Sequence, residues 1–190
     1  MNYFNVRPFT LPIFKSDYLI DDFAVTGATN SMYALSNGAK DKTIFGIILR
    51  ATATTNSVML LSSYFACKNF EAETVCKFIE GSDIRVLMFR NLNPQNRIYV
   101  RMTSTLIELV KIVANVTTIL QSISVGNTSK FNKYRIRAIG PIIEVFVDDK
   151  KIISISESDN INNTGFGFAA ADAAIGVAQA EWQYIAIRPL

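Results

Sequence analysis

The stretch Lys133-Tyr-Arg-Ile-Arg-Ala-Ile-Gly-Pro-Ile-Ile-Glu-Val-Phe-Val-Asp-Asp-Lys-Lys-Ile-Ile-Ser-Ile155 decides the fold, because it contains three β-strand patterns in succession. These segments are rich in β-branched and aromatic residues; they are Tyr134 to Ile139, Ile142 to Val147 and Lys151 to Ile155. The residues between them, Gly140-Pro141 and Asp148-Asp149-Lys150, are of the types that turns favour. Short strands joined by tight turns predict an antiparallel β-meander.

The rest of the chain repeats this alternation of short strands and turn residues. Phe70 to Phe78 alternates between two faces, which predicts a strand with one face in a core and the other in water. Thr105 to Ala114 reads as strands, but its apolar residues also fall at helical spacing, so a short helix is an alternative there. About a dozen short strands at this spacing predict an all-β fold, an antiparallel two-sheet β-sandwich of the jelly-roll type.

No change of composition marks a second domain, so we predict an extended N-terminal arm over residues 1–20 and a single β-sandwich domain over residues 21–190. Pro8 and Pro12 argue against a regular helix in the arm. Its large apolar side chains need either the surface of the domain or a partner, which makes them candidates for assembly contacts. They are Phe4, Phe9, Leu11, Ile13 and Phe14.

Composition excludes several classes of function. The net charge of +3 is spread along the chain, which argues against a nucleic-acid partner, and no apolar run reaches the length of a membrane span. The chain has no histidine, the commonest general base and metal ligand. Cys67 and Cys76 are its two cysteines, and we expect free thiols. With no signal peptide visible at the N-terminus, we expect synthesis in the cytoplasm of a host cell.

The order of these elements resembles the concanavalin A-like lectin and glucanase superfamily, and within it the laminin-G-like jelly rolls. The likeness extends over Asp21 to Leu190 and consists of strand and turn patterns rather than a catalytic signature. The segments that carry it are Phe70-Glu-Ala-Glu, Val86-Leu-Met-Phe-Arg90, Arg97-Ile-Tyr99, Lys133 to Gly140, Val145-Phe-Val-Asp148, Gly165-Phe-Gly-Phe and Glu181 to Ile187. The resemblance implies a β-sandwich and leaves the function open.

Acidic residues provide two candidates for chemistry. The glucanase branch of the superfamily carries acids on one strand as Glu-x-Asp-x-Glu or with one more residue, and the nearest match is Glu71-x-Glu73-x-Val75. Because the third acid is missing, we interpret these residues as a solvated strand face balanced by Lys77. Laminin-G-like relatives bind calcium through Asp side chains at a loop rim, which makes Asp148 and Asp149 candidate ligands, although a simple hairpin turn explains them too.

A polar face offers the best candidate for glycan binding. Arg97, Tyr99 and Arg101 share one face of a strand by parity, and Arg90 is expected beside them on the neighbouring strand. Planar hydrogen-bonding groups next to an aromatic ring suit a sugar ligand. The same residues could instead form an ion-pair face with Glu71 and Glu73, or a contact between subunits.

Two functions follow from these features. The first is a non-catalytic structural or decoration protein of a virion, such as a bacteriophage capsid or tail accessory protein, bound to other virion proteins or to itself. The alternative is a carbohydrate-binding, lectin-like module for attachment to a host surface. On either hypothesis we expect no enzymatic activity, no nucleic acid and no membrane, and no cofactor unless calcium binds.

Overall fold

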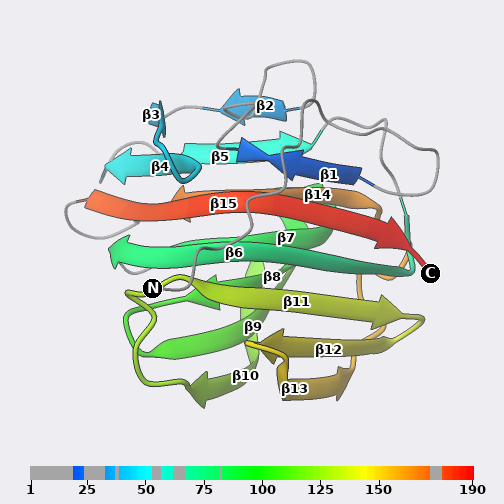
Figure 1. Ribbon diagram of the computed structural model, residues 1–190. Helices are drawn as coiled ribbons and strands as arrows, with labels where there is room; N and C mark the ends of the chain where they lie inside the picture. The colour runs from blue at the N-terminus through cyan, green and yellow to red at the C-terminus, as the bar shows by residue number, and fades with distance from the viewer. Residues whose placement is uncertain are drawn as a thin grey trace.

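The computed structural model describes residues 19–23, 33–36, 39–52, 57–61, 67–81, 83–171 and 177–190. In this part of the chain fifteen strands form two antiparallel sheets that are stacked face to face (Figure 1). The predicted antiparallel two-sheet β-sandwich is therefore confirmed. Among the described residues there is no helix long and apolar enough to cross a membrane.

Sheet 1 lies in front in Figure 1 and has the strand order β13-β12-β11-β6-β15-β4-β3. The long strand β15 pairs with β4 over its first half and with β1 over its second half. The predicted meander forms one edge of this sheet as β11, β12 and β13. The strands of sheet 1 are β1 (Leu19–Asp22), β3 (Ala39–Lys42), β4 (Ile47–Thr52), β6 (Phe70–Glu80), β11 (Asn132–Ile139), β12 (Ile142–Val147), β13 (Lys150–Ser156) and β15 (Val177–Pro189).

Sheet 2 lies behind sheet 1 and has the order β10-β9-β8-β7-β14-β5-β2 (Figure 1). Its strands are β2 (Tyr33–Ser36), β5 (Ser57–Leu61), β7 (Asp83–Asn93), β8 (Asn96–Met102), β9 (Leu106–Val113), β10 (Val116–Ser124) and β14 (Gly165–Ala171). The helix considered for Thr105 to Ala114 is wrong, because β9 pairs with β8 and β10. β9 has apolar side chains on both faces, with Leu109 in the core and Val110 on the outer face. Its sequence therefore does not show the alternation of apolar and polar residues that is typical of a strand.

The core between the sheets is built around aromatic side chains. Trp182 of β15 lies 5.3 Å from Phe168 of β14, centroid to centroid, and Phe70 of β6 lies 4.7 Å from Phe166. Trp182 is fully buried, and its indole N–H donates a hydrogen bond of 3.2 Å to the carbonyl of Val86 in the opposite sheet. In the sequence, Trp182 lies between Ala180 and Tyr184 on one face of the last strand, which predicts burial in the sandwich rather than stacking on a ligand. This prediction is confirmed.

Arg90 connects the two sheets at one end of the sandwich. It lies on β7 of sheet 2, is 0% exposed and has a positive φ of 48°. Its guanidinium donates to the carbonyl of Gly140, in the β11–β12 turn, and at 3.3 Å to the carbonyl of Glu157, which follows β13. Burial lowers the pKa of Arg90, and the charge of Glu157 counteracts this effect. Arg90 therefore ties a strand of sheet 2 to two backbone segments of sheet 1.

Both cysteines are free, as expected. Burial raises the pKa of the Cys67 thiol to about 11, and the pKa of the fully buried Cys76 is also raised, by burial and by the charge of Glu181. A raised thiol pKa lowers the fraction of reactive thiolate. Neither cysteine has the properties of a nucleophile.

The contact between Arg90 and sheet 1 predicts a large loss of stability in Arg90→Ala. The variant removes two charge-assisted hydrogen bonds and leaves one buried and one partly buried carbonyl without these donors, which we expect to cost about 3 kcal/mol. In Arg137→Ala, the matched control, the loss of a partly exposed ion pair with Glu144 at 3.9 Å is expected to cost less than about 1 kcal/mol. Urea unfolding followed by the fluorescence of Trp182 measures both. Similar small losses in the two variants would contradict the role of Arg90.

Alkaline titration provides a second test of the packing. The pKa of each of the tyrosines Tyr33, Tyr99, Tyr134 and Tyr184 is raised, with burial as the largest cause. Since their folded pKa lies above the unfolded value of 10.0, the stability linked to them is present below pH 10 and decreases as the pH rises above it. We expect absorbance at 295 nm to show at most three of the seven tyrosines ionising near pH 10, and the others only on unfolding. Reversible ionisation of all seven near pH 10 with the fold intact would contradict this packing.

Candidate functional site

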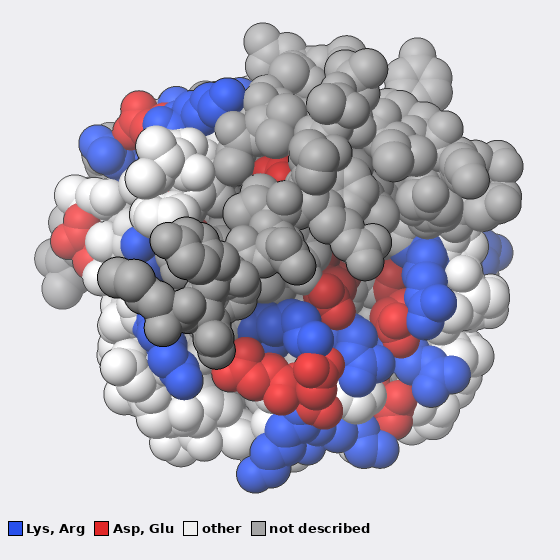
Figure 2. Space-filling model, viewed as in Figure 1, with Lys and Arg blue, Asp and Glu red and all other residues white. Residues whose placement is uncertain are grey.

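The outer face of sheet 1 carries a network of ion pairs. Figure 2 shows Lys and Arg side chains interleaved with Asp and Glu over this sheet. Glu71 on β6 pairs with Arg135 at 3.3 Å and with Arg188 at 2.7 Å, and Glu73 accepts a hydrogen bond from the hydroxyl of Tyr184. This arrangement matches the interpretation of Glu71 and Glu73 as a solvated strand face.

One detail of that interpretation changes. Lys77, expected to balance these two acids, instead pairs at 2.8 Å with Glu181 of β15. Glu181 is almost fully buried and also accepts a hydrogen bond of 2.5 Å from the hydroxyl of Thr43. Lys77 and Glu181 are therefore a structural pair between neighbouring strands.

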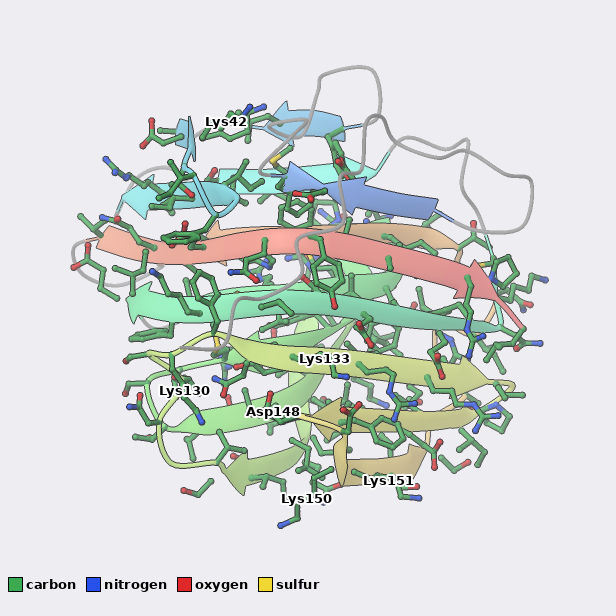
Figure 3. All side chains as sticks on the ribbon, in the orientation of Figure 1. Lys42, Lys130, Lys133, Asp148, Lys150 and Lys151 are labelled. Carbon is green, nitrogen blue, oxygen red and sulfur yellow. The ribbon has the colours of Figure 1, made fainter. Side chains whose placement is uncertain are left out.

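Asp148 and Asp149 form the turn between β12 and β13. Both have positive φ, 47° and 67°, which Asp tolerates better than most residues. Asp148 Oδ1 accepts a hydrogen bond of 2.9 Å from the backbone N–H of Lys133, and the carboxylate of Asp149 pairs with Lys133 Nζ at 2.7 Å (Figure 3). Within the described ranges no three His, Cys, Asp or Glu residues are grouped as metal ligands. The turn accounts for both residues, and calcium binding remains a prediction.

Three of the four glycan-binding candidates lie together on the outer face of sheet 2. Arg97, Tyr99 and Arg101 project from β8, and the strand register places Arg85 of β7 and Glu108 of β9 on either side of Arg101. We call the group Arg85, Arg97, Tyr99 and Arg101 the arginine face. The fourth candidate, Arg90, is not part of it, because its side chain is buried between the sheets.

The arginine face is on the opposite side of the molecule from Glu71 and Glu73. The two acids project outward from sheet 1, whereas the arginines project outward from sheet 2, and the core lies between them. The alternative of an ion-pair face that joins these arginines to Glu71 and Glu73 is therefore wrong. The alternation of residues within a strand could not predict this separation, because it does not show which of the two sheets the strand joins.

Two arginines of this face are held by carboxylates. Arg85 donates through Nε and Nη2 to Asp83, at 3.2 and 2.7 Å to the same oxygen. Arg101 binds Glu108 through the same two nitrogens, each at 2.6 Å. Glu108 is 6% exposed and also accepts a hydrogen bond of 3.2 Å from the hydroxyl of Ser122. These contacts fix the two guanidinium groups and neutralise their charges.

Tyr99 lies between two guanidinium groups. The Cζ atoms of Arg85 and Arg97 are 4.9 and 5.9 Å from the centre of its ring, within the range of cation–π attraction. The ring packs into a small apolar cluster with Met88 and Val110 and is only 3% exposed. Tyr99 therefore does not offer an open ring for a sugar to stack on. It spaces and orients the arginines.

Arg97 differs from the other two arginines, because no carboxylate in the described part of the chain pairs with it. Its Nη1 is 3.9 Å from the thioether sulfur of Met88, a weak acceptor, and its Nε is buried without a partner. Burial and the neighbouring charge of Arg85 lower the pKa of Arg97 to about 10. The side chain is partly exposed and still charged at neutral pH.

The sequence did not reveal Arg85 and Glu108 as parts of this site. The β7–β8 register shifts between Arg85 and Leu87 and again between Phe89 and Asn93, so strict alternation misplaces residues of β7. Glu108 lay within the segment that also had helical spacing. The separation of Glu108 from Arg101 in the sequence suits two residues that face each other across a hairpin, and this was the one signal that could have predicted their pairing.

The comparisons with known proteins concern structure alone, since no protein-family model matches the chain and no curated protein matches its sequence. The carbohydrate-binding module CBM66 from Bacillus subtilis is similar, with a TM-score of 0.65 and 20% identity over 80% of this chain and 91% of that one. The exoplasmic/lumenal domain of VIP36 in its Ca2+/Man-bound form gives 0.65 and 12% identity over 93% and 91%. The laminarinase catalytic domain from Thermotoga maritima gives 0.68 and 11% identity over 95% and 98%.

These likenesses establish the fold and correct one prediction. The chain has the concanavalin A-like jelly-roll fold that its sequence resembled. The prediction that the protein is not an enzyme is contradicted, because the fold it was drawn from also forms the catalytic domain of a laminarinase. At these identities the comparisons carry no function over to this chain, but they do include carbohydrate-binding proteins.

Proposed function

We propose that this protein is a lectin-like module that binds glycans through the arginine face of sheet 2. The observation that carries the proposal is the gathering of three guanidinium groups on one sheet face, two of them against the ring of Tyr99 and the third held by Glu108. Each guanidinium is planar and has five N–H donors in a fixed geometry, which suits the hydroxyl and carboxyl oxygens of sugars. The similarity in fold to CBM66 and to mannose-bound VIP36 supports this hypothesis over a purely structural one.

The face is also rigid, which favours binding. Asp83 and Glu108 hold Arg85 and Arg101, and the buried ring of Tyr99 separates Arg85 from Arg97. Long side chains lose conformational freedom when a ligand immobilises them, and side chains that are already fixed avoid most of that cost. A ligand therefore meets the partly exposed donors of Arg97 and Arg101 already in position, whereas Arg85 is buried and supports the face.

The virion hypothesis remains a prediction from the sequence. Its arm residues Phe4, Phe9, Leu11, Ile13 and Phe14 lie outside the described residues, and the comparisons include no evidence for a virion or for self-association. Attachment of a virion to a host surface would be one setting for a glycan-binding protein. Location on a virion, like synthesis in a host cytoplasm, has no test in the structure.

A glycan array tests the proposal. We expect the protein to bind a restricted set of glycans, and Arg97→Ala to weaken that binding at least about tenfold, since a charged donor at the site is lost. Within the described part of the chain Arg97 has no carboxylate partner, so its removal leaves no acid there unpaired. Arg135→Ala is the matched control, because Arg135 lies on the outer face of sheet 1 and its partner Glu71 keeps Arg188.

Two results would contradict the proposal. The absence of any bound glycan would reject glycan binding, and equal binding by Arg97→Ala and the wild type would reject the arginine face as its location. Circular dichroism of both variants confirms that the fold is intact.

A further inference from the structure

The arginine face has one positive charge that the described residues leave without a negative partner. Asp83 neutralises Arg85 and Glu108 neutralises Arg101, whereas Arg97 contacts only the sulfur of Met88 and the face of Tyr99. Proteins rarely keep a partly buried guanidinium without an acceptor, because burial removes the water that would otherwise solvate it. Arg97 Nε is such a donor.

The partly exposed guanidinium of Arg97 is therefore the group on this face whose charge a ligand can neutralise. A neutral sugar would leave that charge unpaired. An acidic sugar matches it, because an oxyanion accepts hydrogen bonds from a guanidinium. Charge-assisted hydrogen bonds between guanidinium and carboxylate or sulfate are roughly twice as strong as neutral ones.

We propose that the glycans bound by this protein are acidic, and that the partly exposed guanidinium of Arg97 binds the carboxylate or sulfate group. This inference rests on the proposed glycan-binding function and narrows its ligand class. The lowered pKa of Arg97 agrees with a guanidinium that lacks its counter-charge, and a bound oxyanion would raise that pKa again. At neutral pH the charge required for binding is present.

Matched pairs of soluble glycans test the inference. The carboxylate pair is oligogalacturonate and the galactose oligomer obtained by reducing its carboxyl groups; the sulfate pair is dextran sulfate and dextran. Isothermal titration calorimetry with the full chain is expected to show binding to at least one acidic member, at least about tenfold tighter than to its neutral counterpart. The pair whose acidic member binds shows whether the protein recognises a carboxylate or a sulfate.

Two variants separate a specific site from general attraction of a polyanion. Arg97→Gln is expected to lose at least about tenfold in affinity for the acidic member, and Arg97→Lys to lose most of it, because lysine lacks the planar fork of donors. Lys150→Gln removes an exposed positive charge on the β13 edge of sheet 1 and is expected to leave the affinity unchanged. Equal losses in Arg97→Gln and Lys150→Gln would overturn the assignment to Arg97.

The remaining outcomes distinguish the inference from the proposed function. Equal affinity for the acidic and neutral members would overturn the inference and leave glycan binding intact. Binding to neutral glycans on the array, with none to either acidic probe, would have the same meaning. The absence of binding to both the array and the probes would overturn both.

Discussion

The burial of the two sheets against each other, around Trp182 and Phe168, is the contact on which the rest of the structure depends. Once one face of each strand enters this core, the period of two residues sends the intervening side chains outward. The outer face of sheet 1 then receives Glu71 and Glu73, and the outer face of sheet 2 receives Arg97 and Arg101. The two surfaces differ because their charges are paired in different ways. Sheet 1 has a network of ion pairs, whereas sheet 2 keeps one arginine that no carboxylate of the described residues pairs with.

Much of this arrangement could be predicted from local patterns. Four features follow from the two-residue alternation within strands and from the turn residues between them. They are the meander at Lys133 to Ile155, the alternation in β6, the burial of Trp182 and the common face of Arg97, Tyr99 and Arg101. What could not be predicted depends on long-range pairing or on breaks in the alternation. Arg90 has a positive φ next to an irregular part of the β7–β8 pairing, and this turns its side chain into the sandwich. The burial of Tyr99 between two guanidinium groups requires Arg85 from another strand.

The concanavalin A-like fold is compatible with binding and with catalysis, so the fold by itself does not choose between them. The arrangement of side chains gives more direct information. Arg85 and Arg101 are neutralised and fixed by Asp83 and Glu108, and Tyr99 separates the guanidinium groups, so the three together are a rigid frame. Beside that frame lies Arg97, whose guanidinium pairs with no carboxylate among the described residues and whose Nε has no hydrogen-bond partner there. A binding site of this kind owes its affinity to donors that are fixed before the ligand arrives.

A crystal structure of the protein with a bound acidic oligosaccharide tests this account most directly. We predict that the sugar lies on the outer face of sheet 2, with an oxyanion oxygen within hydrogen-bond distance of the Arg97 guanidinium. A sugar bound to the outer face of sheet 1 or to the β12–β13 turn, with Arg97 still unpartnered, would contradict it.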